Sequence, residues 1–229
     1  MFSLSGAFSI LFFFYITNTY NDLTIDAKNR VLLLSSKDRI IKGEKEKFDF
    51  SVNSMSAPVA ISSSSFSVWI TSYSEAKTQR YSLWGELLGE IKTGGNDIDA
   101  DEKGILIAGE QSFLIQIVSG NKIPLIWKEM KRCAISKDSL YLYGEDTLHV
   151  LKRNGKPVIK KLIPELKDIC IFKKNLCFLF NDSLVLNDTV LPIFGGKKAE
   201  GNNEFISVLS DSGIVYYPDP KRNTTPPGN

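Results

Sequence analysis

The chain repeats one pattern of apolar and polar residues at intervals of 35 to 39 residues. Each unit begins with a short apolar strand, continues through a polar turn and reaches a second, more strongly apolar strand. In the third unit these strands are predicted over residues 97–100 and 105–108. The predicted second strands of the six units begin at Val31, Phe66, Ile105, Leu140, Leu176 and Ile214.

Two further strands fit into most units. In the fourth unit we predict them over residues 147–151 and 158–162, joined through Asn154-Gly155, a pair that favours a tight hairpin because both residues tolerate positive φ. Four strands of about five or six residues with short turns fill a period of this length. Each unit therefore predicts one four-stranded sheet.

We predict an all-β fold, a β-propeller of about six four-stranded blades over residues 22–217. One small sheet cannot bury both of its faces, whereas stacking successive sheets around an axis removes apolar surface from water on both sides. Near-continuous apolar strands such as residues 105–108 fit sheets that are covered on both faces. A β-solenoid, or an open propeller completed by a partner, is the alternative.

The two ends of the chain differ from the repeats. Residues 1–21 form an apolar leader without a charged side chain, and residues 218–229 form a polar tail. The leader fits a secretory signal or anchor, although it lacks the usual basic start. It also fits a β-strand that closes the ring, because the sixth unit ends two strands short. A signal would place the protein in the secretory pathway, the periplasm or at a membrane, and a closing strand in the cytoplasm or nucleus.

Two segments resemble blades of the large class of six-bladed propellers with short blades. Residues 97–108 resemble the inner hairpin of NHL-type blades, and residues 151–156 resemble their outer, glycine-containing turn. The Trp-Asp dipeptide of WD repeats is absent, and the double glycines at residues 94–95 and 195–196 do not recur in every unit, as a kelch pattern would require. The resemblance implies binding of a ligand or a protein on the faces of the ring.

Composition narrows the functional classes. The 28 lysine and arginine residues nearly balance 26 acidic residues, so the chain lacks the concentrated basic excess that is typical of nucleic-acid binding. Three cysteines, an odd number without a Cys-x-x-Cys spacing, predict buried thiols rather than a disulfide scaffold or a zinc site. We therefore predict no nucleic-acid partner and no cofactor.

Candidate catalytic and metal-binding groups have simpler structural interpretations. His149 is the only histidine, so this chain cannot form a two-histidine metal site by itself. Asp97, Asp99 and Asp101 alternate along one strand and therefore share a side, which suits calcium, but the spacing of a calcium loop is absent. We interpret them as a strand edge near the entry face. The Gly195-Gly196-Lys197-Lys198 segment lacks the full phosphate-loop spacing, so we interpret it as a connector between blades.

The functional prediction is a non-enzymatic scaffold that binds another protein or complex. Tryptophan is enriched where proteins bind one another, so Trp69, Trp84 and Trp127 are the candidate partner-binding residues, with packing in the core as the alternative. Alanines in the predicted first strands offer little for catalysis. Two other functions stay open: a module that binds small ligands or glycans, and a hydrolase or lyase that uses carboxylates and calcium. Membrane contact is expected only if the leader is an anchor.

Overall fold

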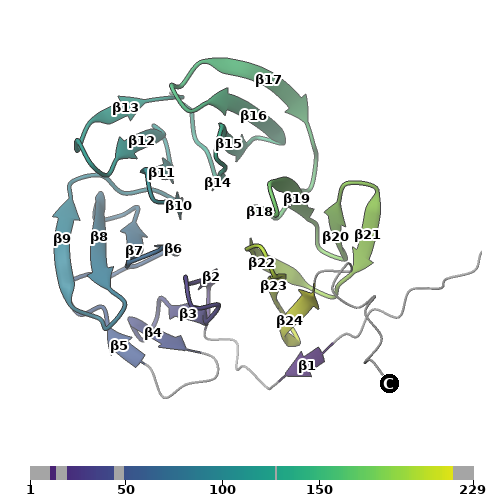
Figure 1. Cartoon of the computed structure of the whole chain (residues 1–229), viewed down its shortest axis with the longest axis horizontal. Coiled ribbons are helices and arrows are strands. Elements are labelled where there is room, and N and C mark those ends of the chain that lie inside the picture. The colour runs from purple at the N-terminus through teal and green to yellow at the C-terminus, as the bar shows by residue number, and fades with distance from the viewer. Residues whose placement is uncertain (1–10, 14–19, 44–48, 127, 219–229) are drawn as a thin grey trace, which may run out of the picture.

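The computed structural model describes residues 11–13, 20–43, 49–126 and 128–218. These residues form six four-stranded antiparallel sheets that are arranged as the blades of a ring (Figure 1). The prediction of an all-β propeller with six blades is thus confirmed. Within the described ranges, no helix is long and apolar enough to cross a membrane.

Five blades use four consecutive strands each. Blade 1 contains β2 (Asp22–Ile25), β3 (Val31–Ser35), β4 (Ile40–Gly43) and β5 (Asp49–Ser51). Blade 2 contains β6 (Ala60–Ser64), β7 (Ser67–Ser72), β8 (Lys77–Ser82) and β9 (Leu87–Ile91). Blade 3 contains β10 (Asp97–Ala100), β11 (Gly104–Ala108), β12 (Phe113–Gln116) and β13 (Lys122–Pro124). Blade 4 contains β14 (Arg132–Ile135), β15 (Ser139–Gly144), β16 (Thr147–Lys152) and β17 (Pro157–Leu162). Blade 5 contains β18 (Asp168–Phe172), β19 (Asn175–Leu179), β20 (Ser183–Leu186) and β21 (Thr189–Pro192).

Blade 6 combines the two ends of the chain. Its strands are β22 (Gly196–Gly201), β23 (Phe205–Ser210), β24 (Gly213–Pro218) and, on the outside, β1 (Leu11–Phe13). Strand β1 runs antiparallel to β24, with Phe12 opposite Val215 (Figure 1). We expected two strands to be missing from this blade, but only one is: β22, β23 and β24 follow one another in the chain, and β1 supplies the fourth strand. Residues 196–201 form its first strand rather than a connector, because backbone pairing with β23 forms a strand even where large apolar side chains are missing.

Apolar side chains between neighbouring blades form the core. Leu32 and Leu34 of blade 1 pack with Ile61 and Ile70 of blade 2, for example, and all four side chains are almost completely buried. A corresponding cluster of buried apolar side chains, which includes Leu209, joins blade 6 to blade 1, so the stacking continues around the ring. Cys133, Cys170 and Cys177 are buried free thiols on strands, as predicted.

The turns define two faces. We call the face that carries the turns between the first and second strands of each blade the inner-turn face. Because neighbouring strands are antiparallel, the turns between third and fourth strands lie at the same end of each blade. The turns between second and third strands, and the connections from blade to blade, lie on the opposite face, which we call the connector face.

Candidate functional site

The first strands of the six blades surround the axis of the ring (Figure 1). Strands β2, β6, β10, β14, β18 and β22 each neighbour the next one, and β22 neighbours β2. Every side chain that these strands direct toward the axis therefore meets side chains from other blades. This central channel is the candidate functional site.

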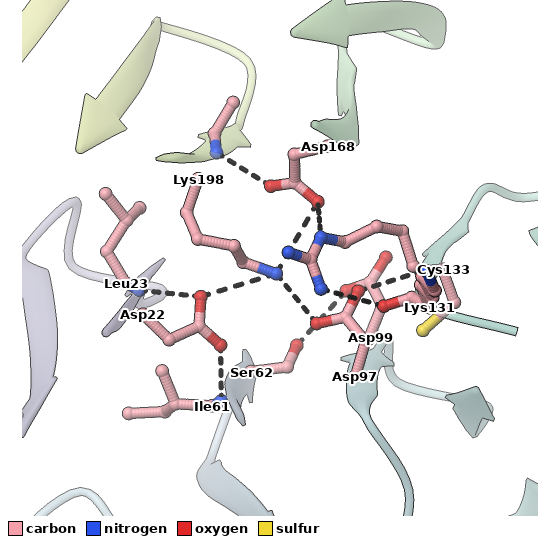
Figure 2. A network of polar contacts seen from close by, with 12 residues as sticks. Asp22, Leu23, Ile61, Ser62, Asp97, Asp99, Lys131, Cys133, Asp168 and Lys198 are labelled. Carbon is pink, nitrogen blue, oxygen red and sulfur yellow. Dashed lines mark hydrogen bonds and ion pairs between the residues drawn. The ribbon is translucent and has the colours of Figure 1, made fainter. Parts of the chain in front are cut away.

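A single lysine joins three aspartates in the channel (Figure 2). The Nζ atom of Lys198, on β22, lies 2.7 Å from Oδ1 of Asp97, 3.4 Å from Oδ1 of Asp22 and 3.5 Å from Oδ1 of Asp168. The lysine side chain is 11% exposed and the three aspartates are 3% exposed or less. A buried carboxylate needs a compensating charge, and one ammonium group serves all three.

The second oxygen of each aspartate binds the next blade. Asp22 accepts a hydrogen bond from the Ile61 N–H at 2.8 Å, Asp97 from the Cys133 N–H at 2.9 Å, and Asp168 from the Ala199 N–H at 2.8 Å. Each carboxylate therefore connects its own blade, the following blade and the central lysine.

The three amides that donate these hydrogen bonds directly follow Ala60, Arg132 and Lys198 in the sequence. In this layer, aspartates of blades 1, 3 and 5 therefore alternate around the ring with Ala60, Arg132 and Lys198 of blades 2, 4 and 6. Arg132 adds a second cation, with Nε 3.4 Å from Oδ1 of Asp168.

Burial and neighbouring charges compete in setting the pKa values of this layer. Burial raises the pKa of Asp22 to about 7, against the opposing effect of Lys198, and it raises the pKa of Asp168 in the same direction. Burial alone would lower the pKa of Lys198, but Asp168, Asp22 and Asp97 outweigh it and raise that pKa. The lysine is therefore charged at every physiological pH.

A second polar layer lies nearer the inner-turn face. Asp99 accepts hydrogen bonds from the Ile135 N–H at 2.6 Å and from the Ser62 hydroxyl at 3.1 Å. Burial raises its pKa to about 7, and burial together with Asp99 raises the pKa of Glu200 well above its usual range. Both residues line a cavity of about 420 Å³ at the mouth of the channel, to which all six blades contribute.

These raised carboxyl pKa values predict a protein that is more stable in mild acid than in mild base. Asp22 and Asp99 have folded-state pKa values of about 7 against an ordinary value of 3.8. At a pH between these two pKa values the folded state binds more protons than the unfolded state. The stability that these carboxyl groups contribute to the folded state is therefore fully present below the ordinary pKa and is lost as the pH rises through the folded-state pKa.

We therefore expect a lower Tm at about pH 8 than at about pH 5.5, measured by calorimetry at constant ionic strength. His149 opposes this trend, because burial, with Lys160 and Lys128, lowers its pKa. The variant Asp99→Asn should flatten the dependence and His149→Gln should steepen it. A Tm that rises across this pH range would contradict the assignment.

Asp97 and Asp99 lie on one side of β10, as the sequence predicted, and Asp101 lies in the turn that follows the strand. Asp97 and Asp99 bind backbone amides of blade 4, and Asp101 forms an ion pair at 2.9 Å with Arg153 of the same blade. They do not converge on a common point for a cation. Among the described residues, no group of three or more histidine, cysteine, aspartate or glutamate side chains is arranged to hold a metal ion. His149 lies on β16, away from the channel-lining strands, opposite Lys160.

The three candidate tryptophans have different surroundings. Trp69 is 4% exposed and packs in the core beside Ile98 and Ile105, with the Arg80 guanidinium 5.3 Å from its ring centroid. Trp84 is 70% exposed on the inner-turn face. Trp127 lies outside the described residues. Of the two candidates that the structure describes, Trp84 is the exposed one, and the prediction for Trp127 stays a prediction.

Sequence reasoning missed the central lysine. The segment around Lys198 contains glycines, lysines and one alanine but no large apolar residue, so it did not resemble a strand. A usable signal was nevertheless present in every second unit. Asp22, Asp97 and Asp168 each directly precede an apolar residue at the start of a first strand. Three buried carboxylates in one layer would have required a cation from another first strand.

Comparisons with known proteins identify the architecture. No family model matches the sequence, and no curated protein is significantly similar to it. Among solved structures, virginiamycin B lyase from Staphylococcus aureus is 12% identical, with a TM-score of 0.64 over 85% of this chain and 78% of that chain. The WD40 domain of Pan2 from Neurospora crassa is 11% identical, with a TM-score of 0.59 over 82% and 71%. A chain of the mitotic checkpoint complex is 9% identical, with a TM-score of 0.60 over 87% and 90%. At such identities the likeness establishes the fold alone, and this chain is a six-bladed β-propeller.

Proposed function

We propose that this propeller is a non-enzymatic module that binds another protein through its inner-turn face. The observation that carries the proposal is an exposed aromatic pair on blade 2. Phe66 is 79% exposed and Trp84 is 70% exposed. Phe66 directly precedes Ser67, which pairs with Ser82, and Trp84 follows Ser82 by two residues, so both rings lie at the same end of the blade.

The surroundings of this pair suit a protein partner. Leu87 and Leu88 of β9 add exposed apolar surface next to the Trp84 turn. The Nζ atom of Lys28 in blade 1 lies 5.1 Å from the centroid of the Trp84 ring, which is close enough for a cation–π contact. Large aromatic residues with a polar and basic surround are typical of the centres of protein interfaces.

The channel supports a non-enzymatic function. Lys198 forms ion pairs with Asp22, Asp97 and Asp168, and each aspartate also accepts a hydrogen bond from the backbone of the next blade. The polar atoms of these four residues are therefore already engaged in holding the ring together. A catalytic group must instead direct a polar atom at a substrate. The similar structures include a WD40 domain and a chain of a multiprotein complex, which agrees with an interaction module, and also a lyase.

A second candidate function is the binding of a small ligand at the channel mouth. The cavity of about 420 Å³ favours it, because this volume falls within the usual range for small-molecule sites. Asp99 and Glu200 at its base would be the recognition groups. We rank this function second because the exposed aromatic pair lies outside the cavity lining.

The test is affinity purification of the full-length protein from its own cells, with mass spectrometry of the proteins that accompany it. We expect one stoichiometric partner. The double variant Phe66→Ser, Trp84→Ser should weaken its binding by nearly a thousandfold, because each hot-spot residue contributes roughly 2 kcal/mol and 1.4 kcal/mol is about tenfold.

The matched control is Phe194→Ser, which removes a ring that is 78% exposed in the connection between β21 and β22, on the connector face. This variant should bind the partner as the original protein does. Equal binding by both variants, or the absence of any partner, would refute the proposal and direct attention to ligand screens at the channel.

A further inference from the structure

Strand β17 differs from the other outermost strands of the ring. All six of its residues are exposed, including Val158, Ile159 and Leu162, which are 51%, 58% and 72% exposed. The outermost strands β1, β5 and β13 have three residues each, Leu191 of β21 is buried, and β9 is one residue shorter than β17. One edge of β17 pairs with β16, and among the described residues no strand pairs with its other edge.

A free strand edge presents unpaired N–H and C=O groups to which an extended segment can add as a further strand. We propose that β17 is a strand-addition site for an acidic, extended segment of a second protein. This site lies on the outer rim of blade 4 and is separate from the aromatic pair of blade 2.

The excess of basic residues around β17 indicates that the partner's segment is acidic. Residues 132–167, which include blade 4, contain eight lysine and arginine residues and four acidic residues, whereas the whole chain is close to balance. Strand β17 itself contains Lys160 and Lys161 and no acidic residue. An added strand that carries acidic side chains opposite these lysines gains favourable cross-strand pairs, and a basic strand is repelled.

The register gives the expected order of residues in the added strand. Lys160 lies opposite His149, which lies opposite Leu142, a residue packed toward blade 3. Ile159 lies opposite Val150, which packs toward blade 5. Side chains alternate along a strand, so within residues 159–162 each side of β17 carries one lysine and one apolar residue. The complementary segment therefore reads apolar, acidic, acidic, apolar opposite residues 159–162.

This order argues against a second copy of the chain as the occupant. The sequence contains two adjacent acidic pairs, Asp101-Glu102 and Glu145-Asp146. The first is followed by Lys103 and the second is preceded by Gly144, so neither is flanked by large apolar residues. Lysines on an edge strand also deter pairing with like strands. The structure thus favours an acidic segment from a different protein.

The experiment uses two synthetic eight-residue peptides and the full-length protein with labelled backbone amides. One peptide has valine, glutamate, glutamate and valine at its central positions, and the other has lysines in place of the glutamates. We expect the acidic peptide at millimolar concentration to shift the amide NMR signals of residues 159–162. It should bind about tenfold more tightly than the basic peptide, because two cross-strand pairs change from attraction to repulsion.

Charge reversal provides the decisive variant. Lys160→Glu with Lys161→Glu should reverse the peptide preference, while Lys103→Glu with Lys137→Glu, which changes the net charge equally at exposed turns of the inner-turn face, should leave it unchanged. The variant Phe66→Ser, Trp84→Ser should also retain peptide binding, which separates this site from the proposed function. Absence of shifts at residues 159–162, or an unchanged preference after charge reversal at β17, would overturn the inference.

Discussion

Replacing Lys198 by methionine should destabilise the folded protein by about 3–5 kcal/mol, the usual cost of removing one partner from a buried ionic network. The change preserves most of the side-chain volume but leaves Asp22, Asp97 and Asp168 without the cation that they share. Arg132 contacts one of these carboxylates, with Nε 3.4 Å from Asp168, so it cannot compensate for the loss. Urea unfolding followed by circular dichroism measures the change.

The neighbouring lysine is a matched control. Lys197 forms an ion pair with Asp211 at 2.8 Å, but the two side chains are 40% and 54% exposed. Lys197→Met should therefore cost no more than about 1 kcal/mol, as is typical of surface ion pairs. Adding Asp97→Asn to Lys198→Met should recover part of the lost stability, because it removes one of the uncompensated carboxylates. Equal destabilisation by Lys197→Met and Lys198→Met would contradict a central role for Lys198.

Removing residues 1–13 should lower the Tm by roughly 5–10 °C. The deletion takes away β1, whose three residues pair with Ile214, Val215 and Tyr216 of β24. Hydrogen bonds contribute about 0.5–1.5 kcal/mol each, which gives a loss of roughly 2–3 kcal/mol, and for a chain of this size 1 kcal/mol corresponds to about 2–4 °C. Thermal unfolding of the two purified chains measures the difference.

The control removes residues 1–10 and keeps β1. This chain should melt well above the chain that lacks residues 1–13. Sequencing the N-terminus of the protein from its own cells then tests the two interpretations of the leader, because removal of a signal would also remove the strand beside β24. A Tm that is equal for the two truncated chains would argue against a closing role for residues 11–13.

The repeat was predictable because it depends on alternation of apolar strands and polar turns, which is visible in each unit separately. The strands predicted near Val31, Ile105 and Leu140 all begin within one residue of their positions in the structure. The weakest prediction was blade 6, where Gly196–Gly201 becomes a strand through pairing with β23 and not through its own apolar content. Local sequence patterns do not record such pairing.

The channel was less accessible to sequence reasoning for a similar reason. Asp97 was recognised as a member of an aligned set of carboxylates, but its ion-pair partner Lys198 is 101 residues away in the chain. Nothing in the local pattern connects the two. Trp69 lies on β7 and is buried where blades stack, whereas Trp84 lies in the turn between β8 and β9 and is exposed.

The position of Lys198 has a consequence for how the protein is made. Synthesis proceeds from the N-terminus, so Asp22, Asp97 and Asp168 leave the ribosome before the lysine that neutralises them. The outer strand β1 likewise emerges long before its partner β24. The central channel and the outer edge of blade 6 therefore both join blade 6 to segments that are synthesised earlier, and a nascent chain that stops short of blade 6 lacks the contacts that complete either. The ring can therefore close only after blade 6 has been synthesised.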